Sequence, residues 1–273
     1  MMENSHTLKQ ISHRCRLDIL EMSQNGGTFI GAAFSCIDIL VYLYTNLLDV
    51  KKIRKKSADR DIFILSKGHG VAALYSILAE VKLLDRKRLS HHLSTKDNVY
   101  WHPNLTMPGI EFHTGSLGHG LTIGIGMAFE SKIMNKNNKT IVVMGDGELN
   151  EGSVWESLLI ANAYQLKNLI VIVDRNLRQA NKTTEDLIPL EPLNEKFEKF
   201  GWDVFECNGH DFEEINSVFA SIKNNHNDKP KIIITKTIRG KGIKSIEDDA
   251  KFWFGNFNSD QLLKLKNELV GEN

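Results

Sequence analysis

Two oxygen-bearing side chains follow neighbouring apolar runs of the sequence and could share a metal ion. Asp146 lies in Gly-Asp-Gly directly after the run TIVVM, and Asn176 follows the next apolar run, LIVIV. Carboxylate and amide oxygens, joined by a backbone carbonyl, suit Mg²⁺ or Ca²⁺ and leave room for phosphate oxygens and water. Gly145 and Gly147 let the backbone approach a bulky anion. A simple turn is the alternative for Gly-Asp-Gly alone, but the second oxygen ligand favours a cation beside a phosphate.

Two glycine-rich turns could supply the anion-binding half of such a site. GSLGHG, from Gly115 to Gly120, opens an expected helix, where small residues present backbone N–H groups to an anion. SKGHG places His69 at a similar turn between a strand and a helix. A structural role and a phosphate contact are both open for this histidine.

Alternating strands and helices must position these turns. The chain opens with an amphipathic helix over residues 8–22, and Ser35 with Asp38 has the capping-box spacing that predicts a helix start. A further helix is expected after Asp211. Apolar runs predict strands over residues 61–65, 140–144, 169–173, 202–207 and 231–235. We therefore predict a single α/β domain over residues 1–273, a doubly wound, mostly parallel sheet with helices on both faces. Ligands bind such sheets beyond the carboxyl ends of the strands.

The composition of the chain bears on its partners and its location. Of 273 residues, 34 are Lys or Arg and 34 are Asp or Glu, so the formal net charge is zero and no nucleic-acid partner is expected. Cys15, Cys36 and Cys207 lack metal-like spacing and indicate reduced thiols in a cytoplasmic protein. The N-terminus lacks a signal pattern. The apolar stretch 30–48 carries Asp38, so we expect a core helix and no membrane span.

The motifs together resemble those of a known family. SKGHG, HP, TGSLGHG, GDGELNEGSVWE, LEPL, GHD and KTIRGKG occur in the order seen in transketolases, from about Leu8 to about Gly255. The chain most resembles the N-terminal, diphosphate-binding half of the split, two-subunit form. This resemblance implies a transferase that moves a two-carbon ketol unit between sugars with thiamine diphosphate and Mg²⁺, with Ca²⁺ as a possible substitute.

The resemblance also implies roles for individual residues. Asp146, Asn176 and the backbone carbonyl of Arg178 match the metal ligands. The positions that match cofactor contacts are His69, Gly115, Ser116, Leu117, Gly147 and Asn176. His102 matches a histidine near the donor's terminal hydroxyl, although its spacing to Gly115 is one residue short. Glu151 matches a glutamate that links paired active sites, so His69, His102 and Glu151 are the expected catalytic residues. We expect Glu148 to be solvated.

The family also uses a pyrimidine-binding domain, whose glutamate activates the cofactor. Only about thirty residues follow KTIRGKG, which is too few for a domain. The resemblance therefore implies a separate C-terminal subunit and a heterotetramer.

Two phenylalanines depart from the family pattern. Phe29 and Phe254 stand where transketolases usually carry histidines over the reacting carbons, and Phe can carry no proton. With His102, they define the expected substrate pocket. Three hypotheses follow. Proton transfer could have moved to His113 or His119 in a sugar transketolase. The donor could instead be a 2-oxo acid such as pyruvate, whose decarboxylation an apolar pocket favours. Alternatively, the chain could be a non-catalytic binding or regulatory subunit.

Overall fold

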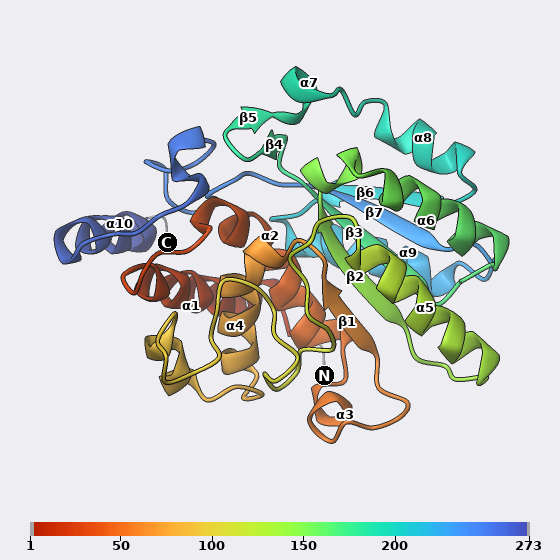
Figure 1. The fold of residues 1–273 in the computed structure, drawn as a ribbon, viewed down its shortest axis with the longest axis horizontal. Helices are drawn as coiled ribbons and strands as arrows, with labels where there is room; N and C mark the ends of the chain where they lie inside the picture. Colours follow the sequence, from red (N-terminus) through yellow and green to blue (C-terminus); the bar gives the residue numbers. More distant parts are fainter. Residues whose placement is uncertain (1–2, 272–273) are drawn as a thin grey trace.

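A five-stranded parallel sheet forms the centre of the computed structural model (Figure 1), which describes residues 3–271 and the side chains of residues 3–269. The strand order is β1-β2-β3-β7-β6. The strands are β1 (Ile62–Leu65), β2 (Thr140–Gly145), β3 (Leu169–Arg175), β6 (Asp203–Asn208) and β7 (Lys231–Lys236). All five correspond to apolar runs that predicted strands. The structure confirms the predicted α/β class.

Helices cover both faces of this sheet (Figure 1). Successive side chains of a strand point to opposite faces, and in β2 the side chains of Ile141 and Val143 join one hydrophobic core whereas Val142 and Met144 join the other. The first core is completed by α1 (Ser5–Ser23), α2 (Ile30–Tyr42), α4 (Val71–Glu80) and α9 (Phe212–Asn224). The second is completed by α5 (Gly120–Ile133), α6 (Gly152–Ala163) and α8 (Leu193–Lys199). The predicted doubly wound arrangement is confirmed.

Further elements flank these layers. They are α3 (Val50–Arg54), the hairpin of β4 (Arg178–Gln179) with β5 (Lys182–Thr183), α7 (Thr184–Leu187) and α10 (Ser259–Gly271), of which α3 and α10 also add side chains to the first core. The hairpin and α7 follow β3 beyond its carboxyl end, and α10 lies beside α1 (Figure 1).

Helix α2 begins earlier than the sequence predicted. It starts at Ile30 rather than at Ser35, and Phe29 precedes it without a side-chain cap. The Ser35 hydroxyl donates to the carbonyl of Ala32 inside the helix and contacts the Asp174 carboxylate. The capping-box prediction was wrong because tertiary contacts use these polar groups. The segment Ile30–Leu47 is long and apolar enough to cross a membrane, but 83% of it is buried inside the fold, as the prediction of a core helix requires.

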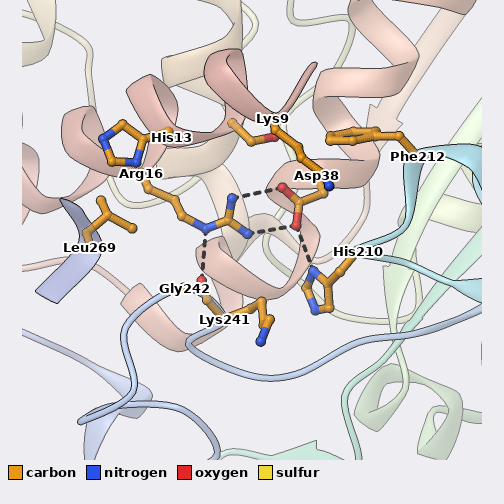
Figure 2. A pocket seen from close by; sticks show the side chains of 10 residues that line it. Lys9, His13, Arg16, Asp38, His210, Phe212, Lys241, Gly242 and Leu269 are labelled. Atoms are coloured by element: carbon orange, nitrogen blue, oxygen red, sulfur yellow. Dashed lines mark hydrogen bonds and ion pairs between the residues drawn. The ribbon is translucent and has the colours of Figure 1, made fainter. Parts of the chain in front are cut away.

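Asp38 on α2 is the centre of a hydrogen-bond network that anchors the loop after β7 (Figure 2). Its buried carboxylate accepts two hydrogen bonds from Arg16, at 2.8 and 2.7 Å, and lies 2.7 Å from His210 Nδ1. His210 Nε2 accepts the Ile238 N–H at 2.9 Å, so the ring hydrogen lies on Nδ1 and is donated to Asp38. Arg16 Nε also donates to the Lys241 carbonyl at 2.8 Å. Helices α1 and α2 thus hold both ends of the segment 238–241.

Candidate active site

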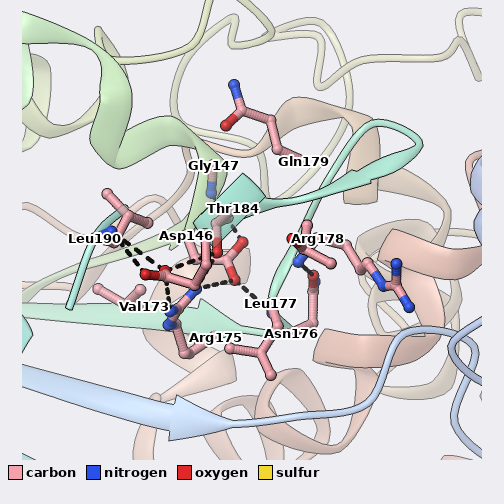
Figure 3. Close-up of polar contacts among 12 residues, drawn as sticks. Asp146, Gly147, Val173, Arg175, Asn176, Leu177, Arg178, Gln179, Thr184 and Leu190 are labelled. Carbon is pink, nitrogen blue, oxygen red and sulfur yellow. Dashed lines mark hydrogen bonds and ion pairs between the residues drawn. The ribbon is translucent and has the colours of Figure 1, made fainter. Parts of the chain in front are cut away.

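The register of β2 and β3 brings the two predicted metal ligands to the same edge of the sheet. Gly145 pairs with Asp174, so Asp146 and Asn176 both lie just beyond the paired residues (Figure 3). The loop before α5 reaches the same edge, where the Thr114 hydroxyl donates to the Leu65 carbonyl at 2.7 Å. The site therefore gathers at the carboxyl ends of β1, β2 and β3, as the sequence predicted.

Asp146 presents a buried carboxylate at this edge (Figure 3). One oxygen accepts the Gly147 N–H at 2.8 Å, and the other accepts the Leu177 N–H at 2.6 Å and a guanidinium hydrogen bond from Arg175 at 3.1 Å. Burial raises the pKa of Asp146 to about 6, and the neighbouring Asp174 carboxylate adds to the increase. A cation beside Asp146 would stabilise its charged form.

Asn176 is held with its amide oxygen turned toward the hairpin. Its Nδ2 lies 3.3 Å from Ser35 Oγ and 3.5 Å from the Asp174 carboxylate, while Oδ1 accepts the Arg178 N–H at 3.1 Å. The Arg178 side chain turns away to pair with Asp248 at 2.7 Å. Only the backbone of Arg178 is then left for the site.

The oxygen atoms of Asp146, Asn176 and the Arg178 carbonyl suit a hard cation that keeps part of its hydration shell. No group of three or more His, Cys, Asp or Glu side chains that could hold a metal occurs in the described part of the chain. The predicted set instead offers one carboxylate, one amide oxygen and one carbonyl. Mg²⁺ is commonly bound by one or two carboxylates together with water and phosphate oxygens, so the residues present suit it in the company of a phosphate ligand.

A buried ion pair between Lys67 and Asp174 lies next to this edge of the sheet, and the sequence analysis singled out neither residue. The Lys67 ammonium contacts the Asp174 carboxylate, with side-chain exposures of 1% and 0%. It also donates to the Ala32 carbonyl at 3.1 Å. Asp174 accepts a further hydrogen bond from Thr237. A charged residue at the end of the apolar run LIVIVD was the available signal.

The glycine-rich turns meet as predicted. A Cβ atom on Gly68 would lie 2.8 Å from the backbone of Gly115, and one on Gly115 would lie 2.6 Å from the His102 ring. Gly115 also has a φ of +139°, which favours glycine. Ser116 is exposed and Leu117 half-buried on the same turn. The structure thus brings SKGHG, GSLG and His102 together.

Phe29 and Phe254 form an aromatic cluster with the expected histidines. Their ring centroids are 5.4 Å apart in an edge-to-face arrangement. Phe29 also lies 6.0 Å from His69 and 6.3 Å from His102. Burial and the nearby Lys67 ammonium lower the pKa of His69 to about 3, so this ring is neutral at physiological pH. All four side chains therefore lie close together beside the glycine-rich turns.

The two alternative histidines lie elsewhere on the surface of this region. His113 and His119 are exposed, and within residues 3–269 neither ring contacts Phe29 or Phe254. His119 Nδ1 lies 3.0 Å from the Leu117 carbonyl. The geometry offers His69 and His102, rather than these two, to a ligand beside the phenylalanines.

The acidic pair after Asp146 divides into one buried and one exposed residue. Glu148 was expected to be solvated, and this was wrong: it is 1% exposed. Its carboxylate accepts hydrogen bonds from the Ser66 hydroxyl, from Gly118 N–H at 2.8 Å and from Gly145 N–H at 3.3 Å. Glu148 therefore joins three turns of the site. Glu151 is exposed at the start of α6, where its side chain lies against Gly118 of the GSLGHG turn.

Arg239 is a further residue that the sequence analysis did not single out. It is 3% exposed and donates to the Ala180 carbonyl, its only side-chain hydrogen bond among the described residues. Burial, followed by the neighbouring Arg178, lowers its pKa to about 10. A buried guanidinium with spare donors beside this edge could bind an anion. The signal was the arginine of KTIRGKG.

Comparison with known proteins agrees with this geometry. Residues 7–271 match the family model for the transketolase thiamine diphosphate binding domain. The chain is 41% identical over 233 residues to one of the subunits of the apulose-4-phosphate transketolase of Phocaeicola vulgatus, covering 85% of this chain and 82% of that protein. It is 34% identical over 242 residues to the 6-deoxy-6-sulfo-D-fructose transketolase subunit SqwG of a Clostridium species, covering 85% and 84%.

Solved structures give the same result for the fold. The chain superposes on the transketolase from Leishmania mexicana with a TM-score of 0.87 and 25% identity. This match covers 99% of the chain but 42% of the longer Leishmania chain. Because the family model spans nearly the whole sequence and the relatives above exceed 30% identity over most of both chains, the chain belongs to the transketolase family and carries its thiamine diphosphate binding domain.

Proposed function

We propose that this chain is the diphosphate- and Mg²⁺-binding subunit of a two-subunit transketolase. The observation that carries the proposal is the convergence of Asp146 and Asn176 at adjacent strand ends, beside the touching turns at Gly68 and Gly115. Oxygen donors for a cation and backbone N–H groups for an anion thus occupy one edge of the sheet.

Each residue then has a physical task. Asp146, Asn176 and the Arg178 carbonyl hold the metal, with Ca²⁺ as a possible substitute. The residues that contact the cofactor are His69, Gly115, Ser116, Leu117, Gly147 and Asn176. When bound, thiamine diphosphate supplies a nucleophilic carbon. Arg239 offers its free guanidinium N–H groups to the diphosphate charge. His102, whose ring is exposed, is the group best placed to hydrogen-bond a donor hydroxyl.

A partner subunit completes the proposed enzyme. The relatives named above are themselves called subunits, and we infer a C-terminal, pyrimidine-binding partner and a heterotetramer, with residues 1–273 forming one domain. Exposed apolar side chains on α6 and at the end of α5 support a subunit contact there: Leu159, Ile160, Ile133 and Met134 are 49–62% exposed. Glu151 lies at the start of α6, where it can face another subunit.

The donor is proposed to be an anionic ketose. Two relatives are named for apulose 4-phosphate and for 6-deoxy-6-sulfofructose, both of which carry a charged terminal group. A 2-oxo acid donor is the second candidate, favoured by the contact between Phe29 and Phe254, which makes the pocket partly apolar. The buried, unpaired thiols of Cys15, Cys36 and Cys207 support a reducing, cytoplasmic location.

Calorimetric titration tests the proposal. Thiamine diphosphate and Mg²⁺ are titrated into the chain alone and into its complex with a co-expressed C-terminal transketolase-like subunit. We expect tight, Mg²⁺-dependent binding in the complex, lost in Asp146→Ala and retained in Asp260→Ala, which alters an exposed carboxylate on α10. Absence of binding in both the chain and the complex would contradict the proposal. Donor screening with ketose phosphates, a sulfonated ketose and pyruvate then separates the two candidate reactions.

A further inference from the structure

A second hollow opens at the amino ends of the strands, on the opposite edge of the sheet from the candidate active site. Its volume is about 830 Å³, which lies within the range of small-molecule pockets. The apolar side chains that line it include Ile170 at the start of β3 and Phe219 and Ile222 on α9. Tyr42 and Phe219 stack on each other, with ring centroids 5.3 Å apart and planes 16° apart, and are 2% and 8% exposed. These side chains give the hollow a rigid apolar floor.

Four of the other lining side chains are lysines. Lys139, Lys167 and Lys231 stand at or just before the starts of β2, β3 and β7, and Lys223 lies on α9. The remaining polar lining residues are Asn216, Asn225, His226 and Asn227. No Asp or Glu is among the residues that line the hollow. Because like charges close together repel, an anion between these side chains would relieve the repulsion.

Two of these lysines have no compensating partner among the described residues. Lys167 pairs with Asp228 at 2.8 Å, and the Lys231 ammonium donates to the Lys229 carbonyl at 2.6 Å. The ammonium groups of Lys139 and Lys223 make no ion pair or hydrogen bond within residues 3–269. Their charge is available to a ligand.

We propose that this hollow binds a small amphipathic anion, which consists of an apolar body bearing a phosphate, sulfonate or carboxylate group. The apolar floor of the hollow receives the body, and Lys139 and Lys223 receive the charge. Lysine is depleted in protein–protein interfaces, so a lysine-rich hollow favours a small ligand over a protein partner. The exposed apolar side chains of α5 and α6 are the better subunit contact. The hollow is distinct from the cofactor site because it lies beyond the opposite ends of the same strands.

A fluorescent aromatic sulfonate, 8-anilinonaphthalene-1-sulfonate, tests the apolar part of this proposal. The probe is titrated into the full chain with saturating thiamine diphosphate and Mg²⁺. Ala220 lines the hollow and Ser221 does not, although both are exposed on α9. We expect Ala220→Trp to abolish the saturable, high-affinity fluorescence increase and Ser221→Trp to retain it. Equal probe affinity in the two variants would overturn the proposal.

Charge reversal tests the cationic part without filling the hollow. The double variant Lys139→Glu/Lys223→Glu is compared with Lys87→Glu/Lys264→Glu, which reverses two exposed lysines elsewhere. We expect about a tenfold or greater loss of probe affinity in the first variant only, which corresponds to about 1.4 kcal/mol. An equal loss of probe affinity in both variants would show that overall charge causes the effect, and would contradict a binding site at this hollow.

Competition then defines the ligand. Aromatic phosphates and aromatic carboxylates are each tested for displacement of the probe, and we expect at least one of the two classes to compete. The titration is repeated without thiamine diphosphate. A high-affinity probe signal that is seen only without the cofactor would place the probe in the cofactor site and overturn the inference. Displacement only by an acidic peptide would overturn it in favour of a protein ligand. Neither outcome depends on whether the chain has transketolase activity, so the proposed function is tested separately.

Discussion

The Lys67 ammonium and the Asp174 carboxylate form a fully buried ion pair between the first glycine-rich turn and the end of β3. Lys67 lies two residues before His69, and Asp174 lies two residues before Asn176. Asp174 also accepts hydrogen bonds from Ser35 and Thr237. The pair therefore ties the expected cofactor turn to the expected metal ligand, although neither residue was expected to belong to the site.

Removing one partner of this pair should be costly. We expect Asp174→Ala to lower the free energy of unfolding by about 3–5 kcal/mol, because it leaves the Lys67 ammonium buried without its counter-charge. Urea denaturation measures the change. The double variant Lys67→Met/Asp174→Ala should recover part of the loss, since no unpaired charge then remains. A double variant as unstable as the sum of the single variants would contradict an energetic coupling between the two residues.

Glu148 should stabilise the fold although it lies in an expected metal-binding motif. Glu148→Ala removes the acceptor for Ser66, Gly118 and Gly145. We expect a loss of about 3 kcal/mol or more in the free energy of unfolding, because each of the three buried donors left unpaired costs about 1–3 kcal/mol. Glu156→Ala on α6 is the matched control, since Glu156 is exposed, and should change stability by about 0.5 kcal/mol or less. Similar losses in the two variants would show that the Glu148 contacts contribute little.

Asp146 and Asn176 could be placed from the sequence, whereas the burial of Glu148 could not. Asp146 and Asn176 were placed correctly relative to the sheet because apolar runs reveal strands and parallel strands share one carboxyl edge. Glu148 was misjudged because its burial depends on Ser66 and Gly118, which lie far from it in the sequence.

The predicted start of α2 was wrong for a related reason. Its true first turn has no polar cap, while Ser35 and Asp38 have capping-box spacing but donate to or accept from distant residues. Local patterns therefore predicted the layers of the fold and the glycine-rich turns. They could not predict long-range polar contacts, such as the one between Arg239 and Ala180, which no local pattern encodes.

His69 should stay neutral well below physiological pH. Its burial, together with the Lys67 charge, lowers its pKa to about 3. We expect the ring nitrogen chemical shifts of His69, followed by two-dimensional ¹⁵N NMR, to remain those of a neutral imidazole between pH 5 and pH 8. The His69→Gln variant assigns the signal. An imidazolium spectrum at pH 5 would contradict a neutral His69 ring.

The stabilising contribution of the Asp38 carboxylate should be lost in acid. Burial by itself would raise the pKa of this carboxyl, but Arg16 and His210 outweigh burial and hold it below its ordinary value of 3.8. A carboxyl with a lowered folded-state pKa contributes stability above its unfolded pKa and loses it as the pH falls. We therefore expect the free energy of unfolding to decrease as the pH falls below about 4. Asp38→Asn should be less stable at neutral pH and show a shallower decrease in acid, whereas Asp260→Asn should follow the original chain.

Restoring histidines beside the cofactor turns should reveal what the two phenylalanines do. Phe29 and Phe254 contact each other edge to face, and the double variant Phe29→His/Phe254→His returns groups that can donate and accept protons. We expect this variant, assayed in the complex, to gain kcat/KM for simple ketose phosphates relative to pyruvate, because a positioned acid or base typically contributes about 10²–10⁴-fold. The lost aromatic contact should cost about 0.5–1.5 kcal/mol in stability.

The single variants separate a pocket effect from a loss of folding. Phe254→Leu keeps an apolar side chain while removing the aromatic contact, so it should lower stability to a similar extent without changing the ratio of the two donors. If Phe254→Leu and Phe254→His shift the donor ratio equally, ring contact rather than proton transfer determines the choice of donor. If neither Phe29→His nor Phe254→His alters that ratio, the phenylalanines do not select the donor, and the next residues to test belong to the proposed partner subunit.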